Sequence, residues 1–321
     1  MSKRRMVQWR RVLQAVVIGG VVCTGPALHV APATAQPSAS DPRILARFDF
    51  AQGQTPEAIT LAPDGSADVS LARASTAVSV APDGSVTPLG AVPRSGGCPV
   101  LGIPWGAGIA RAHDGSVYLV DCAGDADTGV WRLHGPDPAT QVARLPRASV
   151  PHGMALDGQD GDLYVADSSL GVVWKIPSTG GEATVWASGP ALQRVSLFGA
   201  NGVAVHNDAV WVSNTDQGTI VEIPIRADGT AGPTRVVASG MAGDIGSFAV
   251  FGRDDRIVAA LTRSNEVVLI RRGAPPQVLL TAADGLSNPT AVAVANGTLY
   301  VSNGAYFTDS DPNVLVAGFG R

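Results

Sequence analysis

Six short segments of the chain repeat one pattern of small, apolar and polar positions. Each has a variable first residue, then a small residue, a short apolar strand, a turn, and a returning strand rich in Val, Tyr and Trp. The first residues of the segments, at spacings of 50, 45, 49, 45 and 44, are Glu57, Ala107, His152, Asn201, Gly246 and Thr290. This period is that of a four-stranded blade, so the pattern predicts an all-β, six-bladed β-propeller.

The turns and later strands of each repeat agree with this fold. Asp-Gly pairs such as Asp64-Gly65 follow the first strands and are typical of tight β-hairpins, because both residues tolerate a positive φ. No segment keeps the period of a helix, and a pair of β-sandwiches would not produce six units with a shared first position. We expect residues 43–50 to pair with residues 314–319, so that an N-terminal strand closes the ring in the last blade.

The first 35 residues have the composition of an export signal. Residues 1–11 are basic, residues 12–22 are apolar, and residues 33–35 supply small side chains for a cleavage site. The alternative is a membrane anchor, but the apolar run is shorter than the ~20 residues that span a bilayer. We therefore expect a signal peptide at 1–35, a disordered linker at 36–42, the propeller at 43–321, and a secreted or extracytoplasmic protein with no stable membrane span.

The charge of the chain limits which partners are expected, and its cysteine content limits which compartment is expected. Residues 1–35 hold five of the 23 basic residues and none of the 27 acidic ones, which leaves 18 bases against 27 acids and a net charge of −9 in the rest. Such an acidic surface repels nucleic-acid phosphates, so we expect a small-molecule substrate and no nucleic acid. We expect a monomer. After the signal, Cys98 and Cys122 remain as an even pair, which indicates either a disulfide or two buried thiols.

The repeat places two groups of residues at one mouth of the ring. The first strands of all blades enter there, so their leading residues converge, and the second strands return to the same mouth. The returning ends are Asp121, Asp167, Asn214 and Asn303. Convergent polar groups form a candidate ligand site, although Asp and Asn after a strand also commonly cap turns. Trp105, before the second leading position, is either an apolar wall of the mouth or packs between blades.

Three phrases of the third repeat carry a resemblance to a known family. Residues 151–157 read PHGMALD, residues 162–167 read DLYVAD, and residues 173–177 read VWKIP. These resemble the gluconolactonase, regucalcin (senescence marker protein) and strictosidine-synthase-like six-bladed propellers, and the similarity extends over all six repeats. The resemblance implies an axial divalent cation that polarises a lactone carbonyl. A glutamate of the first blade and asparagine or aspartate of the third, fourth and fifth would hold it.

Carried over position by position, the resemblance is partial. Glu57 and Asn201 match the glutamate and the fourth-blade asparagine. His152 replaces the third-blade asparagine, and Gly246 replaces the fifth-blade carboxylate. Asp244, two residues earlier, could substitute only if the backbone bulges. Glu57, Asn201 and His152 are therefore the predicted metal ligands, for calcium or, because an imidazole favours transition metals, for a zinc-like ion.

The resemblance favours an exported, metal-assisted hydrolase that acts on a lactone or a related ester. In this hypothesis His152 is a metal ligand or a general base, because imidazole titrates near neutral pH, although it could equally fill the channel as a structural residue. Asp167 is the second predicted catalytic residue. Substrate contacts are predicted for Asn214, Thr290, Trp105 and Asn303.

Two other functions stay open at this point. The first repeat, residues 56–65, is similar to secreted fungal propellers that direct pericyclic cyclisations, and the small Ala107 and Gly246 leave room for an extended substrate without a metal. A propeller face can also bind peptides or glycans without catalysis. No nucleophile elbow, phosphate loop, zinc-protease motif or complete dinucleotide fingerprint occurs in the chain.

Overall fold

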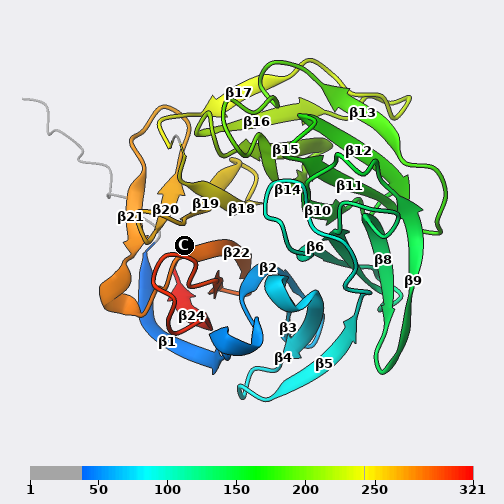
Figure 1. The fold of residues 1–321 in the computed structure, drawn as a ribbon. Coiled ribbons are helices and arrows are strands. Elements are labelled where there is room, and N and C mark those ends of the chain that lie inside the picture. The colour runs from blue at the N-terminus through cyan, green and yellow to red at the C-terminus, as the bar shows by residue number, and fades with distance from the viewer. Residues whose placement is uncertain (1–37, 242, 321) are drawn as a thin grey trace, which may run out of the picture. The chain divides into compact units, whose positions relative to one another are not determined.

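The computed structural model describes residues 38–241 and 243–320, and these residues form six antiparallel β-sheets around one axis (Figure 1). Each sheet has four strands. The expected all-β, six-bladed propeller is therefore confirmed. The predicted signal peptide, residues 1–35, lies outside the described residues.

The strands of a blade follow one another outward from the axis, except that the outermost strand of blade 6 comes from the N-terminal side. Blades 1 to 3 consist of β2 (Pro56–Leu61), β3 (Ala67–Leu71), β4 (Thr76–Val80) and β5 (Val86–Ala91); β6 (Trp105–Arg111), β7 (Val117–Cys122), β8 (Gly129–His134) and β9 (Asp137–Arg144); β10 (Pro151–Leu156), β11 (Asp162–Asp167), β12 (Val172–Pro177) and β13 (Thr184–Ser188). Blades 4 to 6 consist of β14 (Ala200–His206), β15 (Ala209–Asn214), β16 (Thr219–Pro224) and β17 (Arg235–Ala238); β18 (Ile245–Phe251), β19 (Arg256–Leu261), β20 (Glu266–Ile270) and β21 (Gln277–Leu280); β22 (Pro289–Ala295), β23 (Thr298–Asn303), β24 (Asn313–Phe319) and β1 (Ala39–Arg47).

The first strands of neighbouring blades pack against each other all round the axis, from β2 against β6 to β22 against β2 again. Glycine after the leading residue allows this close approach. A Cβ atom on Gly108 would lie 2.5 Å from the carbonyl oxygen of His152, and one on Gly153 would lie 2.4 Å from that of Asn201. Glycine at these positions is thus a packing requirement, because a larger side chain there would push two inner strands apart. Blades 1, 5 and 6 carry other small residues at this position: Ala58, Ser247 and Ala291.

The ring closes in blade 6, where β1 pairs antiparallel with β24 as predicted. The strand begins at Ala39, however, so residues 39–42 of the expected linker belong to the sheet. Ala39 pairs with Phe319 and Ser40 with Gly318. The pairing tolerates Pro42 because the register shifts between Ser40 and Arg43, so the missing N–H of proline falls at a bulge. The extra pairs cover backbone groups of β24 that would otherwise form an open edge.

Six clusters of buried apolar side chains hold the blades together. Each cluster joins two neighbouring blades, and together they continue round the ring. The largest fully buried side chains are Trp211 and Tyr164, in the second strands of blades 4 and 3. Within the described ranges, no helix is long and apolar enough to cross a membrane.

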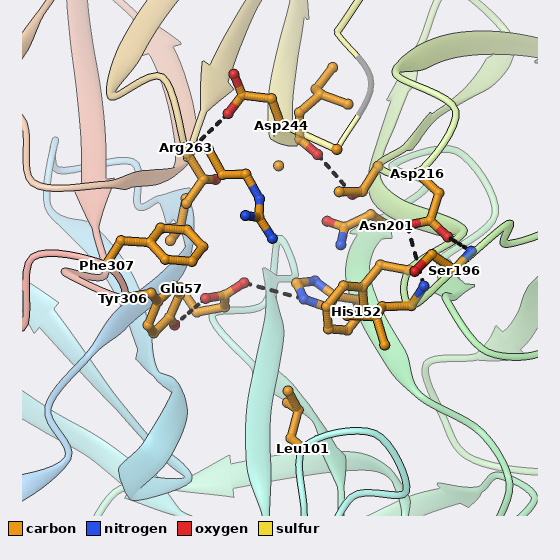
Figure 2. Close-up of a pocket in the computed structure, with 18 of the residues that line it drawn as sticks. Glu57, Leu101, His152, Ser196, Asn201, Asp216, Asp244, Arg263, Tyr306 and Phe307 are labelled. Atoms are coloured by element: carbon orange, nitrogen blue, oxygen red, sulfur yellow. Dashed lines mark hydrogen bonds and ion pairs between the residues drawn. The ribbon is translucent and has the colours of Figure 1, made fainter.

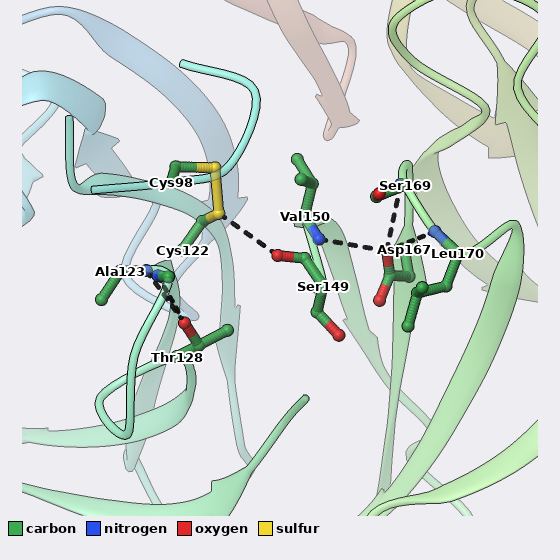
Figure 3. The surroundings of a disulfide bond; sticks show 10 residues. Cys98, Cys122, Ala123, Thr128, Ser149, Val150, Asp167, Ser169 and Leu170 are labelled. Carbon is green, nitrogen blue, oxygen red and sulfur yellow. Dashed lines mark hydrogen bonds between the residues drawn. A yellow bond between two sulfur atoms is a disulfide. The ribbon is translucent and has the colours of Figure 1, made fainter. Parts of the chain in front are cut away.

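A disulfide bond joins Cys98 and Cys122, whose Cα atoms are 5.0 Å apart (Figure 3). This confirms the bridged alternative for the cysteine pair. The bond fixes the loop between β5 and β6 to the end of β7. The same loop carries Leu101 and Ile103, which line the cavity described next.

Candidate active site

The leading residue of every blade lies in a β-bulge at the same mouth of the ring. The pairing of first and second strands shifts register there, as between Pro151 and Met154 on either side of His152, and the shift recurs in all six blades. A bulge can re-aim a side chain out of the regular pleat, here toward the axis. Five of the six leading residues line a cavity of about 800 Å³ (Figure 2): Glu57, His152, Asn201, Gly246 and Thr290.

Glu57 and His152 face each other inside this cavity (Figure 2). The His152 Nε2 atom is 3.4 Å from Glu57 Oε1, and the Tyr306 hydroxyl donates a hydrogen bond to Glu57 Oε2. Phe198 meets the imidazole edge-on, with ring centroids 6.2 Å apart. Tyr306 therefore holds the carboxyl group through one oxygen, while the other oxygen faces the imidazole. We call Glu57, His152 and Asn201 the axial site.

Burial shifts the pKa values of both ionisable groups toward their neutral forms. Burial raises the pKa of Glu57 from 4.5 to about 7, and the hydrogen bond from Tyr306 opposes part of that rise. Burial lowers the pKa of His152 from 6.5 to about 4, so the imidazole is neutral at physiological pH. Burial and the adjacent Glu57 raise the pKa of Tyr306 well above its ordinary value, so its hydroxyl keeps its proton. The axial site thus holds a carboxyl group that exchanges a proton near pH 7.

Asn201 is buried at the axial site, and its amide is free. Its side chain makes no hydrogen bond with any of the residues that the structure describes. Buried amides normally have partners, so an unpaired one at a cavity wall indicates a place for a ligand or a water molecule. Thr290 differs, because its hydroxyl oxygen lies 3.1 Å from the carbonyl oxygen of Pro56 and 3.0 Å from the Ser302 hydroxyl. Thr290 therefore lines the cavity as predicted, with its hydroxyl already engaged.

The predicted residues at the returning strand ends do not reach the cavity. Asp167 is fully buried, and its carboxylate accepts hydrogen bonds from the backbone N–H groups of Val150, Ser169 and Leu170 (Figure 3). It also accepts one from the indole of Trp174. Asn214 and Asn303 are also fully buried, and they bond to Ala191, Gln193 and Gln217, and to Ser287 and Asn313, respectively. Asp167 is therefore a structural residue and not the predicted catalytic one. Asn214 and Asn303 likewise hold turns instead of substrate, because their polar atoms are already bonded.

Trp105 has both of its predicted roles, since it is an apolar wall of the mouth and also belongs to the core cluster between blades 2 and 3. It lines the cavity and packs against Tyr306, with ring centroids 5.3 Å apart. Phe198 and Ile245 extend the apolar lining on other blades. These side chains give the axial site an apolar border on one part of the cavity, which strengthens its electrostatic interactions.

Asp244 does not replace the missing fifth-blade ligand. The backbone does bulge between Ile245 and Phe248, but the Asp244 carboxylate is bonded elsewhere. Its Oδ1 accepts hydrogen bonds from the backbone N–H groups of Arg263 at 2.6 Å and Ser264 at 3.1 Å, and Oδ2 accepts one from the Ser264 hydroxyl. The carboxylate thus fixes the turn between β19 and β20 and leaves no carboxylate of blade 5 at the axis.

The axial site does not offer the ligand set of the cation that the resemblance implies. Calcium takes about six to eight oxygen ligands, whereas only Glu57 and Asn201 present side-chain oxygens here, and one Glu57 oxygen already accepts from Tyr306. A catalytic zinc ion takes about three ligands from His, Cys, Asp and Glu. In the described part of the chain, no group of three or more such residues is placed to hold a metal. Glu57, Asn201 and His152 therefore supply only part of the ligand set of the predicted divalent cation.

The axial site also depends on Tyr306, which bonds to Glu57 and which the repeat pattern did not indicate. Tyr306 lies between β23 and β24, after the last returning strand, and belongs to no repeated phrase. The loop folds back over the axis because Asn288 accepts hydrogen bonds from the backbone N–H groups of Phe307 and Thr308. Only the three-dimensional arrangement reveals this contact.

No protein-family model and no curated protein matches this chain. Solved structures do resemble it. A luciferin-regenerating enzyme has a TM-score of 0.63 at 12% identity, over 87% of this chain and 95% of that one. A gluconolactonase from Xanthomonas campestris has a TM-score of 0.61 at 17% identity, over 91% and 99%. A PQQ-bound aldose sugar dehydrogenase from Streptomyces coelicolor has a TM-score of 0.61 at 18% identity, over 89% and 99%.

The resemblance to gluconolactonase propellers is thus confirmed at the level of fold. At these identities the likeness concerns the fold alone, and the same fold includes a dehydrogenase. Fold and site together define a six-bladed propeller in which a buried carboxyl group and a neutral imidazole form a pair in a cavity at the axis. The activity has to be argued from that pair.

Proposed function

We propose that the protein hydrolyses a lactone or a related carboxylic ester at the axial site, with Glu57 as the general base. The observation that carries this proposal is the buried Glu57 carboxyl group, whose pKa of about 7 suits proton transfer at neutral pH. The likeness of the fold to a gluconolactonase supports the same class of substrate. The proposed reaction uses no metal, because Glu57 and Asn201 offer few side-chain oxygens and one Glu57 oxygen already accepts from Tyr306.

In the proposed reaction a water molecule beside Glu57 attacks the acyl carbon of the substrate. Oε1 of Glu57 takes one proton from the water as the new C–O bond forms. It returns that proton to the alkoxide oxygen when the original acyl C–O bond breaks. The products are a carboxylic acid and a hydroxyl group, which in a lactone belong to one hydroxy acid. A second cavity of about 60 Å³ adjoins Glu57, His152 and Asn201 and has room for a few water molecules.

Asn201 and His152 are placed to stabilise the negative charge that develops on the carbonyl oxygen. The unpaired Asn201 amide has two N–H donors, and the neutral His152 imidazole has one. Donors that are already fixed in an apolar site stabilise such an oxyanion without reorganisation. This arrangement gives each member of the axial site a role in one acyl-transfer step.

Hydrolysis of a lactone panel tests the proposal. The purified protein is incubated with gluconolactone, with a δ-lactone that carries a long alkyl chain, and with an aryl ester, each with and without EDTA. We expect a product heavier than its substrate by one water, formed at a rate that EDTA does not change. Activity that EDTA abolishes and a divalent ion restores would show that the axial site does hold a metal. Absence of hydrolysis across the panel would count against the esterase chemistry.

A metal-free cyclisation is the second candidate function, and the large apolar lining of the cavity favours it. An extended substrate could be folded there into a reactive conformation, with Glu57 or Asn201 as a hydrogen-bond partner. Mass spectrometry separates the two candidates. Cyclisation leaves the mass of the substrate unchanged, whereas hydrolysis adds one water.

The pH dependence of hydrolysis should report the titration of Glu57. Glu57 acts as a base only when deprotonated, so kcat/KM should rise with pH and level off above about 7. Tyr306→Phe removes the hydrogen bond that lowers the pKa of Glu57, so the midpoint should move to higher pH. The measurement is kcat/KM against pH for both proteins. Tyr300→Phe is the control, because its hydroxyl bonds to the Gly65 carbonyl outside the cavity. A midpoint that Tyr306→Phe leaves in place would rule out Glu57 as the titrating base.

We also propose that the protein acts in an extracytoplasmic compartment as a monomer. The signal-like composition of residues 1–35 and the Cys98–Cys122 disulfide support export to an oxidising environment. Detection of the disulfide-bonded chain in culture medium, beginning after residue 35, would test this. Chromatography with light scattering would test the monomer.

A further inference from the structure

We propose that the substrate of the axial site is a bulky apolar lactone or ester that carries a carboxylate group. The ester or lactone group in this inference rests on the proposed hydrolysis. Its other two parts, the apolar body and the negative charge, come from the walls and rim of the cavity and can be tested without any reaction.

The volume and lining of the cavity favour an apolar body. About 800 Å³ is within the range of sites that enclose drug-sized molecules. The apolar part of the lining includes Trp105, Phe198, Ile245 and the ring of Tyr306, beside polar residues such as Arg263 and Asp216. A polyhydroxylated sugar lactone would bring hydroxyl groups against these surfaces without hydrogen-bond partners, which is unfavourable. An alkyl, aryl or polycyclic body would instead displace water from apolar walls.

The rim of the cavity is also apolar and is exposed to solvent. Four large side chains of the rim, with exposed fractions of 41%, 79%, 50% and 57%, are Ile103, Val195, Leu197 and Phe307. They come from three separate connections: β5 to β6, β13 to β14, and β23 to β24. The other exposed large apolar residues of the described chain lie on outermost strands of four blades: Val86, Val185, Val236 and Val278. Apolar residues gathered at one cavity mouth mark a ligand site, whereas scattered ones do not.

The connection that carries Val195 and Leu197 is held firmly over the cavity. The Asp216 carboxylate accepts hydrogen bonds from the backbone N–H groups of Val195 at 2.9 Å and Ser196 at 2.5 Å, and from Leu197 at 3.4 Å (Figure 2). These bonds fix the backbone, so the two exposed apolar side chains are presented in a set position. A preorganised rim loses little conformational freedom on binding.

Arg263 supplies the positive charge. Its guanidinium group extends into the cavity and lies 4.9 Å from the centroid of the Phe307 ring (Figure 2). It forms no ion pair with the residues that the structure describes. The Asp244 and Asp216 carboxylates, which also line the cavity, accept hydrogen bonds from backbone N–H groups. Arg73 also lines the cavity without an ion pair within the same ranges. A guanidinium group beside apolar side chains suits a planar carboxylate, which it can bind through two parallel hydrogen bonds.

Binding of three compounds that cannot be hydrolysed tests the substrate class. The probes are 1-naphthaleneacetate, its uncharged amide 1-naphthaleneacetamide, and gluconate, each titrated into the full-length protein by calorimetry. We expect the naphthalene carboxylate to bind tightest, the amide about fivefold more weakly, and gluconate at least about tenfold more weakly than the carboxylate. Gluconate binding as tight as that of the naphthalene carboxylate would overturn the proposal.

Two variants test whether Arg263 and Leu197 cause these differences in binding. Arg263→Gln should weaken the carboxylate about fivefold and leave the amide unchanged, whereas Arg253→Gln, on an exposed turn between β18 and β19, should change neither. Leu197→Ser should weaken both naphthalene probes and leave gluconate unchanged. Equal responses of carboxylate and amide to Arg263→Gln would refute the charge assignment. If both probes bind as expected while no ester is hydrolysed, the ligand class stands and the proposed reaction fails.

Discussion

Replacing Glu57 with glutamine is expected to lower kcat for ester hydrolysis by a factor of about 10²–10⁴. Glutamine has nearly the size of glutamate, and its carbonyl oxygen can still accept the hydrogen bond from Tyr306, but it cannot take a proton from water. KM should change little, because the carboxyl group acts on the attacking water. Steady-state kinetics with the most rapidly opened lactone of the panel measure both constants.

The same variant should unfold less readily than the wild type above neutral pH. The folded pKa of Glu57, about 7, exceeds its ordinary 4.5, so stability is greatest at low pH and is lost as pH rises through 7. Glutamine does not ionise, so Glu57→Gln should be more stable at about pH 8, by up to about 3 kcal/mol, and the difference should shrink toward about pH 5. This result would show that lost activity does not come from misfolding.

Glu182→Gln is the matched control for Glu57→Gln. Glu182 is exposed and lies outside the cavity, so its replacement should alter neither kcat nor the pH dependence of stability. Full activity in Glu57→Gln would end the assignment of a general base. A loss of equal size in Glu182→Gln would show that the assay responds to something other than the axial site.

Loss of the Cys98–Cys122 bond is expected to lower the free energy of unfolding by about 3 kcal/mol. The bond joins residues separated by 24 positions, and without it the unfolded chain gains conformational entropy. Urea unfolding of Cys98→Ser/Cys122→Ser measures the change. Wild-type protein reduced with dithiothreitol is the matched control, because it loses the bond without any new side chain.

Removal of the bond should also affect the cavity rim. The bond fixes the connection that carries Leu101 and Ile103, so the reduced protein should bind 1-naphthaleneacetate more weakly than the oxidised protein does. If the oxidised and the reduced protein unfold at the same urea concentration, the stabilising role of the bond is rejected.

The fold could be predicted from the sequence because the same packing constraints recur in every blade. The small second position of the repeat recurs because inner strands meet at the axis, as the close approach of Gly108 to His152 shows. The closing strand was predicted because an open edge on β24 requires a partner. Its start was misplaced, because Pro42 in a Pro/Ser stretch is typical of a linker, and only the bulge in the pairing accommodates it.

The axial site was predicted in part. Glu57, His152 and Asn201 were chosen correctly as converging residues, since one repeat position places all three in equivalent bulges. The returning residues could not be assigned in the same way, because an Asp such as Asp167 occupies the same register whether it binds a ligand or caps its turn. Tyr306 and Arg263 lie in the connections between the second and third strands of blades 6 and 5. Every blade has this connection, but neither side chain recurs at the equivalent place in all repeats, so periodicity does not single them out.

The pairing of β1 with β24 also governs when the molecule can fold. Ala39 pairs with Phe319, so the sheet of blade 6 cannot assemble until residues 313–319 have been synthesised. Until then blades 5 and 1 each lack a neighbour, and the nascent polypeptide remains incompletely folded. This delay is compatible with the proposed export, because a polypeptide that has not yet closed can still be threaded through a translocation pore.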